Sequence, residues 1–222
     1  MSTVSELKSR ILAHRGLNPS ADERNYRSLS AIERAFSRGF GVEVDVTSNN
    51  GKVVLAHDPP EAEFETKEMS ELVRILRREW KDQILALNIK SSGLAMHMPK
   101  IEQRHFFFDN AVPDLINFYK KNMPVAARIS EYEILPPIHL MRSDVIWLDS
   151  FISDWFLSKT KSSEFAPEIL AIPGLKVFVS PELHRRPKGE MWAALQKVFA
   201  KRNDVAICTD EPEQFFESLN VA

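Results

Sequence analysis

The sequence predicts an α/β fold in which residues 1–222 form a single (β/α)8 TIM-barrel domain. Two observations support this prediction. Eight short runs rich in Val, Ile and Phe recur along the chain, each followed by a polar loop and a segment with helical periodicity. This alternation is typical of a parallel sheet covered by helices. The composition, 44% hydrophobic over 222 residues, is also sufficient for one large core.

The apolar runs themselves are the expected strands. They span residues 10–14, 41–46, 84–89, 104–109, 124–129, 144–149, 175–180 and 204–209. A ninth run, 52–57, follows the turn-forming sequence SNNG, and we expect it to form a hairpin with the second strand. Helices are expected at 30–38, 67–77, 112–120, 134–141 and 188–200, several of them beginning at Pro or at Ser, Thr or Asp.

A doubly wound open sheet is the alternative arrangement of the same elements. The chain has only 7 Gly, and HRGLNPS, after the first strand, matches neither the G-x-G-x-x-G fingerprint nor a P-loop. These two ways of holding nucleotide phosphates are therefore disfavoured.

Charge and hydropathy argue against several kinds of partner. Lys and Arg total 29 against 31 Asp and Glu, a net charge of -2, which offers no electrostatic basis for binding nucleic acid. No apolar run approaches the roughly 18 residues of a membrane span, and the first ten residues lack the apolar region of a secretory signal. We therefore expect a cytoplasmic protein whose oligomeric state the sequence does not define. Cys208 is the only cysteine, and we expect it to be a small core residue.

Polar residues gather where the predicted strands end. In a (β/α)8 barrel the carboxyl ends of the strands and the loops after them build the active site. The polar residues at these ends are His14, Arg15, Glu43, Asp45, His57, Asp58, Asn88, Lys90, Asp109, Arg128, Asp149, Thr209 and Asp210. The active site is therefore expected among them.

Glu43 and Asp45 lie on one face of the second strand, because successive side chains of a strand alternate between faces. Two carboxylates this close must share a proton, meet a cation or bind a metal. A divalent metal cation, Mg²⁺ or Ca²⁺, would suit both carboxylates together with the amide oxygen of Asn88. A solvated strand face, or an ion pair with Lys90, is the alternative.

His14 and His57 end two of the apolar runs. A pair of imidazoles beside a phosphodiester can deprotonate the attacking hydroxyl and protonate the leaving oxygen. Asp58, or another carboxylate at this end of the barrel, is expected to orient a ring. Arg15 and Lys90 supply donors for phosphate oxygens.

Other strand-end residues are further candidates for the site. Asp109 and Asp149 follow their strands directly. Arg128 and Glu131 lie near the end of the fifth strand, where an internal salt bridge and substrate binding are both open. The cationic loop 184–189 is expected to be solvated surface, since charge runs usually are. His97, His105 and His139 are assigned no role.

These motifs resemble those of the glycerophosphodiester phosphodiesterases, a family of the phosphatidylinositol-phospholipase-C-like phosphodiesterase superfamily, whose barrel also houses the related sphingomyelinase D-like enzymes. The matching stretches are HRG at 14–16, Asn25, AIERAFSRGFGVEVDV at 31–46, NGKVVLAHD at 50–58, a strand ending at Lys90, and ICTDEPEQF at 207–215. The resemblance is dense up to Asp58, and beyond Lys90 it depends on strand rhythm and the closing TDEP.

The resemblance implies a metal-dependent hydrolase of small-molecule phosphodiesters. By that resemblance His14 and His57 would be the acid and base, and Arg15 and Lys90 would lie at the phosphate. Glu43 and Asp45 would bind the divalent cation. Attack by a substrate hydroxyl, through a cyclic phosphate, and attack by water are both known in the family.

Two features depart from the family pattern. Asn88 stands where a third carboxylate usually precedes the strand-end lysine by two residues, so we expect weaker cation binding. Segment 59–68 is shorter than the corresponding loop of typical members, which would open or reshape the substrate side of the site. The resemblance therefore does not by itself imply specificity for glycerol. A non-catalytic barrel that binds a phosphorylated ligand or partner is therefore the alternative function. A sugar isomerase or aldolase barrel is a more distant one, since those barrels also use strand-end lysines and metal-binding carboxylates.

Overall fold

A computed structural model describes residues 3–17, 28–60, 66–133 and 142–220 of the chain. The expected helix 134–141 and Asn25 lie outside the described residues, as does much of the short segment 59–68. The strands are β1 (Ile11–His14), β2 (Gly41–Asn49), β3 (Lys52–Leu55), β4 (Lys67–Glu68), β5 (Leu85–Ile89), β6 (His105–Phe108), β7 (Ala126–Ile129), β8 (Val145–Leu148), β9 (Leu175–Val179) and β10 (Val205–Thr209). The α/β prediction is confirmed, and each expected strand is present within two residues of its expected bounds, except that β2 ends three residues later than expected.

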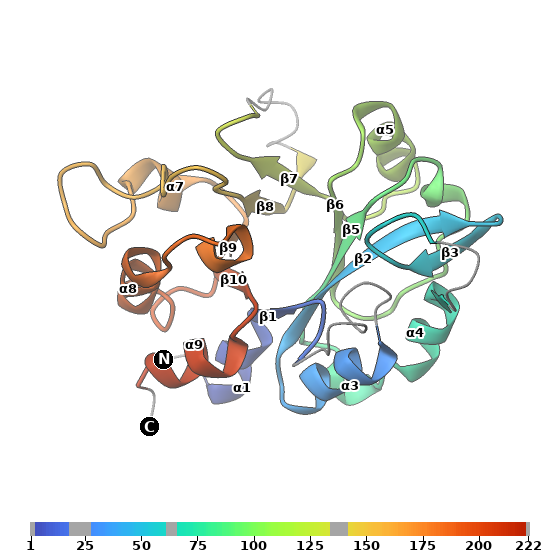
Figure 1. The fold of residues 1–222 in the computed structure, drawn as a ribbon, viewed down its shortest axis with the longest axis horizontal. Coiled ribbons are helices and arrows are strands. Elements are labelled where there is room, and N and C mark those ends of the chain that lie inside the picture. The colour runs from blue at the N-terminus through green and yellow to red at the C-terminus, as the bar shows by residue number, and fades with distance from the viewer. Residues whose placement is uncertain (1–2, 18–27, 61–65, 134–141, 221–222) are drawn as a thin grey trace.

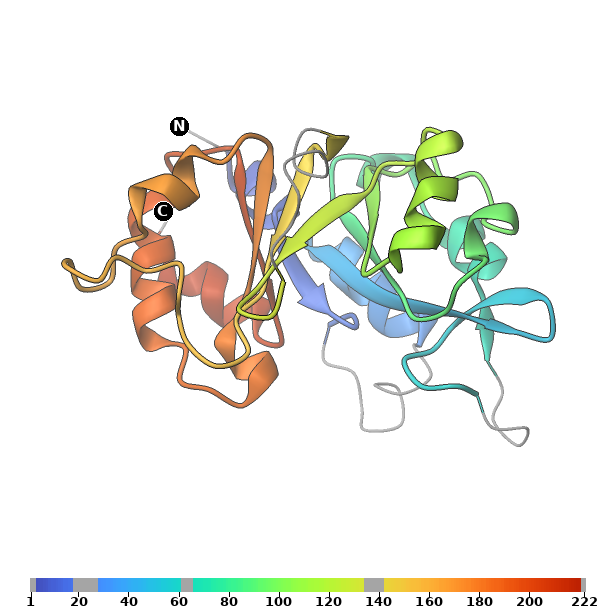
Figure 2. The same ribbon diagram turned by 90° about the horizontal axis from the view of Figure 1, so that it is seen from above.

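The described helices cover one face of this sheet. They are α1 (Val4–Ser9), α3 (Leu29–Ser37), α4 (Met69–Ile75), α5 (Val112–Lys120), α7 (Pro167–Ala171), α8 (Gly189–Val198) and α9 (Pro212–Ser218), with short 3-10 helices η1 (Arg78–Trp80), η2 (Leu94–Met96) and η3 (Pro181–His184). Figure 1 shows α3, α4 and α5 around β2 and β5, and α7, α8 and α9 beside β9 and β10. Seen from above, the strands lie between these two groups (Figure 2). The sequence did not predict α1, α7 and α9, which are too short for a clear helical period.

Eight strands pair in parallel in the order β7-β8-β9-β10-β1-β2-β5-β6, and β3 and β4 extend the sheet from the far part of β2 as antiparallel strands. A regular closed barrel would continue this ladder from β6 to β7. Among the described residues only one parallel bridge, Phe107 to Val125, joins these two strands, with the Phe107 N–H donating to the Pro124 carbonyl at 2.9 Å. Pro124 has no N–H to donate in return. The sheet is therefore a large, mainly parallel one whose ladder is open at this point, and the expected regular closure is not observed.

Two clusters of apolar side chains form the core. The larger one packs between the sheet and the helices and includes Val42, Val44 and Val46 of β2. The smaller one lies on the other face of the strands and draws on seven of the eight parallel strands or the residues next to them. Its members are Leu12, Ile84, Ala86, Phe106, Phe108, Ala126, Trp147, Leu175, Val177, Val179, Ala206 and Cys208. The sheet therefore curls around an inner core, and toward the carboxyl ends of the strands polar residues replace apolar ones on this inner face.

Cys208 is fully buried in the inner cluster, as expected for a core residue. Burial raises the pKa of its thiol well above the ordinary value, which keeps it protonated. Within the described residues, no helix combines the length and the apolar character needed to cross a membrane.

Candidate active site

One cavity of about 290 Å³ lies at the carboxyl ends of the parallel strands. Every residue predicted to act on the substrate or the metal lines it, as do the further candidates Asp109, Arg128 and Asp149. Of the other polar residues considered from the sequence, Glu131, Asp58, Thr209 and Asp210 do not line it. We call one part of its lining, from β1, β2, β5 and the residues after β3, the motif wall: His14, Arg15, Glu43, Asp45, His57, Asn88 and Lys90. The part contributed by β6, β7, β8 and η3 is called the second wall: Phe108, Asp109, Arg128, Trp147, Asp149, Phe151 and His184.

Each histidine of the motif wall meets a carboxylate at Nδ1. The His14 Nδ1 donates to Asp210 Oδ1 at 2.9 Å, and the His57 Nδ1 donates to Asp58 Oδ1 at 2.8 Å. A carboxylate accepts but does not donate when ionised, so each neutral ring carries its proton on Nδ1 and presents Nε2 as a base. The expectation that Asp58 or another nearby carboxylate orients a ring is confirmed for both histidines.

The turn after β1 holds Arg15 beside the carboxylates. Arg15 adopts a left-handed backbone conformation, φ 63°, and its N–H donates to the Glu43 carbonyl at 3.0 Å. Gly16 follows at φ 91°, where a Cβ would lie 2.8 Å from the Ala31 carbonyl carbon. Only glycine meets both the conformation and the close approach. The glycine of the HRG motif therefore fixes the turn from which Arg15 enters the cavity.

The two carboxylates of β2 are almost completely buried, Glu43 at 2% and Asp45 at 1% exposure. Asp45 lies 3.4 Å from Arg15 Nε and 3.3 Å from Lys90 Nζ. The ion pair with Lys90 weighed from the sequence is thus present. It joins two neighbouring strands, since β2 pairs with β5 and Asp45 lies opposite Asn88 in the register.

The fit of a divalent cation to this wall depends on Asn88. Its Oδ1 is buried and has no hydrogen-bond partner among the described residues. Buried polar atoms are rarely left in this state without a ligand or water. Across the described ranges, no group of three or more His, Cys, Asp and Glu side chains is arranged to hold a metal. The donor set of Glu43, Asp45 and the Asn88 amide consists of oxygen ligands, the kind that a hard divalent cation prefers, with only two formal negative charges.

Asp149 and His184 form a pair on the second wall. The His184 Nε2 donates to Asp149 Oδ1 at 2.7 Å, and the same oxygen accepts the Ser150 N–H at 2.9 Å. The His184 ring also lies 4.5 Å from the Phe151 ring, centroid to centroid. The expectation that loop 184–189 is solvated surface is wrong for its first residue. His184 is the last residue of the 3-10 helix η3, which no sequence signal marked, so its return to the cavity was not predictable.

Arg128 lies between two carboxylates. Its NH1 is 3.0 Å from Asp109 Oδ1, and it donates to both oxygens of Glu133 at 2.7 and 3.1 Å. An internal salt bridge is thus present, with Glu133 as the partner rather than Glu131. Burial raises the pKa of Asp109 to about 6, although Arg128 and Lys90 both act to lower it. Asp109 is therefore partly protonated near neutral pH.

Glu131 lies outside the cavity lining. Its carboxylate accepts the backbone N–H groups of Phe151, Ile152 and Ser153 at 2.9 to 3.0 Å. These bonds fix the loop after β8, from which Phe151 reaches the cavity. In the structure Glu131 therefore positions the second wall without contributing to its surface.

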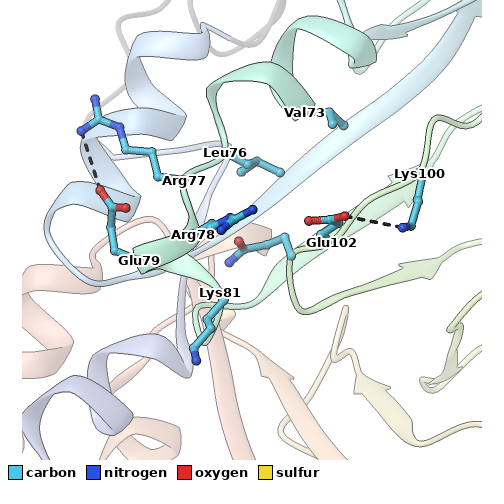
Figure 3. A pocket seen from close by; sticks show the side chains of 9 residues that line it. Val73, Leu76, Arg77, Arg78, Glu79, Lys81, Lys100 and Glu102 are labelled. Carbon is cyan, nitrogen blue, oxygen red and sulfur yellow. Dashed lines mark hydrogen bonds and ion pairs between the residues drawn. The ribbon is translucent and has the colours of Figure 1, made fainter.

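Another cavity, of about 850 Å³, lies away from the carboxyl ends of the strands (Figure 3). Val73, Leu76 and the segment around η1 line it, together with Lys100 and Glu102. The Lys100 ammonium lies 3.5 Å from the Glu102 carboxylate, the pair drawn at the right of Figure 3. In the described part of the chain, the residues that line this cavity include no predicted site residue and no histidine. The chemistry expected from the sequence is therefore concentrated in the smaller cavity.

Comparison with known proteins bears on the fold. The chain is similar to the solved structure of a phosphodiesterase from Oleispira antarctica in complex with the product sn-glycerol-3-phosphate. The TM-score is 0.62 at 15% identity, and the match covers 99% of this chain and 100% of that one. No family model matches the chain, and neither does any curated protein. The likeness concerns the fold alone, and it confirms the expectation that this chain is folded like a phosphodiesterase.

Proposed function

We propose that this chain is a metal-dependent hydrolase of small-molecule phosphodiesters, related in its chemistry to the glycerophosphodiester phosphodiesterases. The observation that carries the proposal is the motif wall. Two histidines, two cations, two carboxylates and one amide come from four separate stretches of sequence and line one cavity. We further propose that the eight parallel strands together form one barrel. The inner apolar cluster that these strands surround supports this, since it lies beneath the cavity.

The charges of the motif wall suit a phosphodiester only when a cation is added. With both carboxylates ionised, Glu43 and Asp45 balance Arg15 and Lys90, and the formal charges cancel. A phosphodiester brings one further negative charge into a mostly buried site, which is costly without compensation. A divalent cation held by Glu43, Asp45 and Asn88 would supply that compensation and polarise the phosphoryl oxygens.

The two histidines are suited to proton transfer. Each ring is fixed at Nδ1 by a carboxylate, which leaves Nε2 for the substrate. One ring would take the proton of the attacking hydroxyl or water as the new P–O bond forms. The other, in its protonated form, would give a proton to the oxygen that leaves as the old P–O bond breaks. Arg15 and Lys90 would hold the phosphate oxygens during this exchange.

The test is hydrolysis of a phosphodiester panel, with bis(p-nitrophenyl) phosphate and glycerophosphodiesters, by the wild type and by His14→Ala and His57→Ala. We expect each substitution to abolish measurable turnover, a loss of about 10² to 10⁴ for one acid or base, while circular dichroism shows a folded protein. EDTA should silence the wild type, and Mg²⁺ or Ca²⁺ should restore it. Full activity in both variants would sink the mechanism.

One observation favours a non-catalytic phosphate-binding protein as the second candidate. Asp45 already lies close to both Arg15 and Lys90, and Asn88 adds no charge to the metal ligands. Both features weaken cation binding. Metal analysis of the purified protein and the phosphodiester panel together decide between the two candidates. Phosphate binding without hydrolysis, in the presence of added metal, would favour the non-catalytic protein.

A further inference from the structure

Three histidines line the candidate active-site cavity, and acid–base chemistry on a phosphodiester uses two of them. His14 and His57 meet their carboxylates at Nδ1. His184 is held the other way round, with Nε2 donating to Asp149 Oδ1 at 2.7 Å. It therefore presents the opposite nitrogen, and the proposed mechanism gives it no task.

The His184 ring is held in place from several sides. Asp149, at the end of β8, fixes Nε2, and the Phe151 ring packs beside the imidazole at 4.5 Å. Two residues further on, Arg186 donates to the Ser150 carbonyl at 2.8 Å, which ties the segment after η3 to the loop after β8. A side chain oriented in this way loses little entropy when it binds a ligand.

The nitrogen left for a ligand is Nδ1. Because Asp149 accepts from Nε2, the neutral ring has its proton there and a lone pair on Nδ1. Within the described residues Nδ1 makes no hydrogen bond, and it is not among the buried atoms that lack a partner. It is therefore not fully buried, and it belongs to a side chain that lines the cavity and is 23% exposed.

We propose that His184 is a specificity-determining residue whose Nδ1 accepts a hydrogen bond from a hydroxyl group on the alcohol portion of the substrate. The inference depends on the proposed function, because it takes the phosphate to lie at the motif wall. The lone pair on Nδ1 of a neutral ring disfavours an anionic group and favours a hydrogen-bond donor. An ester whose alcohol portion carries no free hydroxyl group displaces water from Nδ1 and leaves this nitrogen without a hydrogen bond, which costs binding energy.

The test compares two phosphate monoesters that differ in their hydroxyl groups, sn-glycerol 3-phosphate and methyl phosphate. Calorimetry measures their binding, with Mg²⁺ present, to the wild type, His184→Gln and His184→Asn. The Gln amide mimics Nε2 and can keep the bond to Asp149, whereas the Asn amide mimics Nδ1. His97→Gln, at an exposed histidine away from the cavity, is the matched control.

We expect the wild type to prefer sn-glycerol 3-phosphate and His184→Gln to lower that preference about tenfold, equivalent to about 1.4 kcal/mol. His184→Asn should keep part of it, and the control all of it. A wild type without the preference, or an unchanged ratio in a folded His184→Gln, overturns the inference. Absence of hydrolysis across the phosphodiester panel, with the tenfold change still seen, overturns the proposed function instead.

Discussion

The two walls of the cavity place their charges differently. On the motif wall, the Asp45 carboxylate meets Arg15 and Lys90, and all three residues lie in β2 or directly after the strands that flank it. On the second wall, Arg128 and Asp149 also lie at strand ends, and Arg128 meets Asp109, which directly follows β6. Both also have partners outside the strands, at Glu133 and at His184 of η3. The motif wall therefore depends on strand register, and the second wall also depends on how segments between the strands fold back.

This difference suggests a division of labour. A wall fixed by strand register suits the phosphate, whose geometry is the same in every phosphodiester. A wall built from loops suits the part of the substrate that varies. Substitutions on the motif wall should therefore affect turnover of every substrate, and those on the second wall should affect stability or substrate choice.

The largest effect is expected at Lys90. Lys90→Met removes a proposed phosphate donor and a cation beside Asp45, which keeps Arg15 as a neighbour. We expect kcat to fall by about 10² to 10³ for every phosphodiester that the wild type cleaves, the range seen when one transition-state donor is removed. Stopped assays on the panel measure it. Lys100→Met, at a lysine that is 86% exposed, is the control and should match the wild type. A loss confined to one substrate would break the comparison.

The next effect concerns stability at the second wall. The pKa of Asp109 is raised to about 6, so the folded protein binds its proton more tightly than the unfolded chain does. Stability should therefore fall as the pH rises from about 4 to about 6, by about 2 to 3 kcal/mol, and stay level above that.

Asp109→Asn removes this titration and should flatten the profile over that window. Urea unfolding from pH 4 to 7.5 measures the difference between wild type and variant. Asp144→Asn changes the charge equally at an exposed position and serves as the control. Parallel profiles for wild type and Asp109→Asn would contradict the role of burial at this carboxyl.

A smaller effect is expected for the cation affinity of the motif wall. Asn88→Glu adds the carboxylate that the family pattern has at this position, opposite Asp45 in the register. We expect Mg²⁺ or Ca²⁺ to bind about tenfold more tightly, since ligand charge tunes such sites. Calorimetric titration with either ion measures it, and Asn88→Gln is the neutral control. Unchanged or weaker binding would mean that Asn88 is not a metal ligand.

The smallest effect is expected at Glu131. Glu131→Gln removes the charge that three backbone N–H groups share, and we expect a loss of about 1 kcal/mol in the free energy of unfolding. Because Glu131 lies outside the cavity, the ratio of rates for different phosphodiesters should change little, although the variant is less stable than the wild type. Denaturant unfolding and the substrate panel together measure both. A loss of all turnover in a folded variant would place Glu131 in the chemistry.

Much of the fold and of the motif wall could be predicted from the sequence. The strands were visible because Val, Ile and Phe gather in short runs, and Glu43 and Asp45 could be placed on one face because side chains alternate along a strand. Two contacts could not be predicted. Asp210 reaches His14 because β10 pairs with β1, and His184 returns to Asp149 at the end of the 3-10 helix η3. Both are contacts between residues far apart in the sequence.

The sequence by itself determined which chemical groups end the strands, because local periodicity and the HRG, E-x-D and HD motifs are properties of short segments. Only the tertiary structure decided how those groups are paired. Register across β1, β2 and β5 places Arg15 and Lys90 beside Asp45, and burial raises the pKa of Asp109 to about 6. Among the described residues, the same packing leaves one bridge, Phe107 to Val125, between β6 and the start of β7. Pairing and burial depend on residues that meet only when the chain is folded.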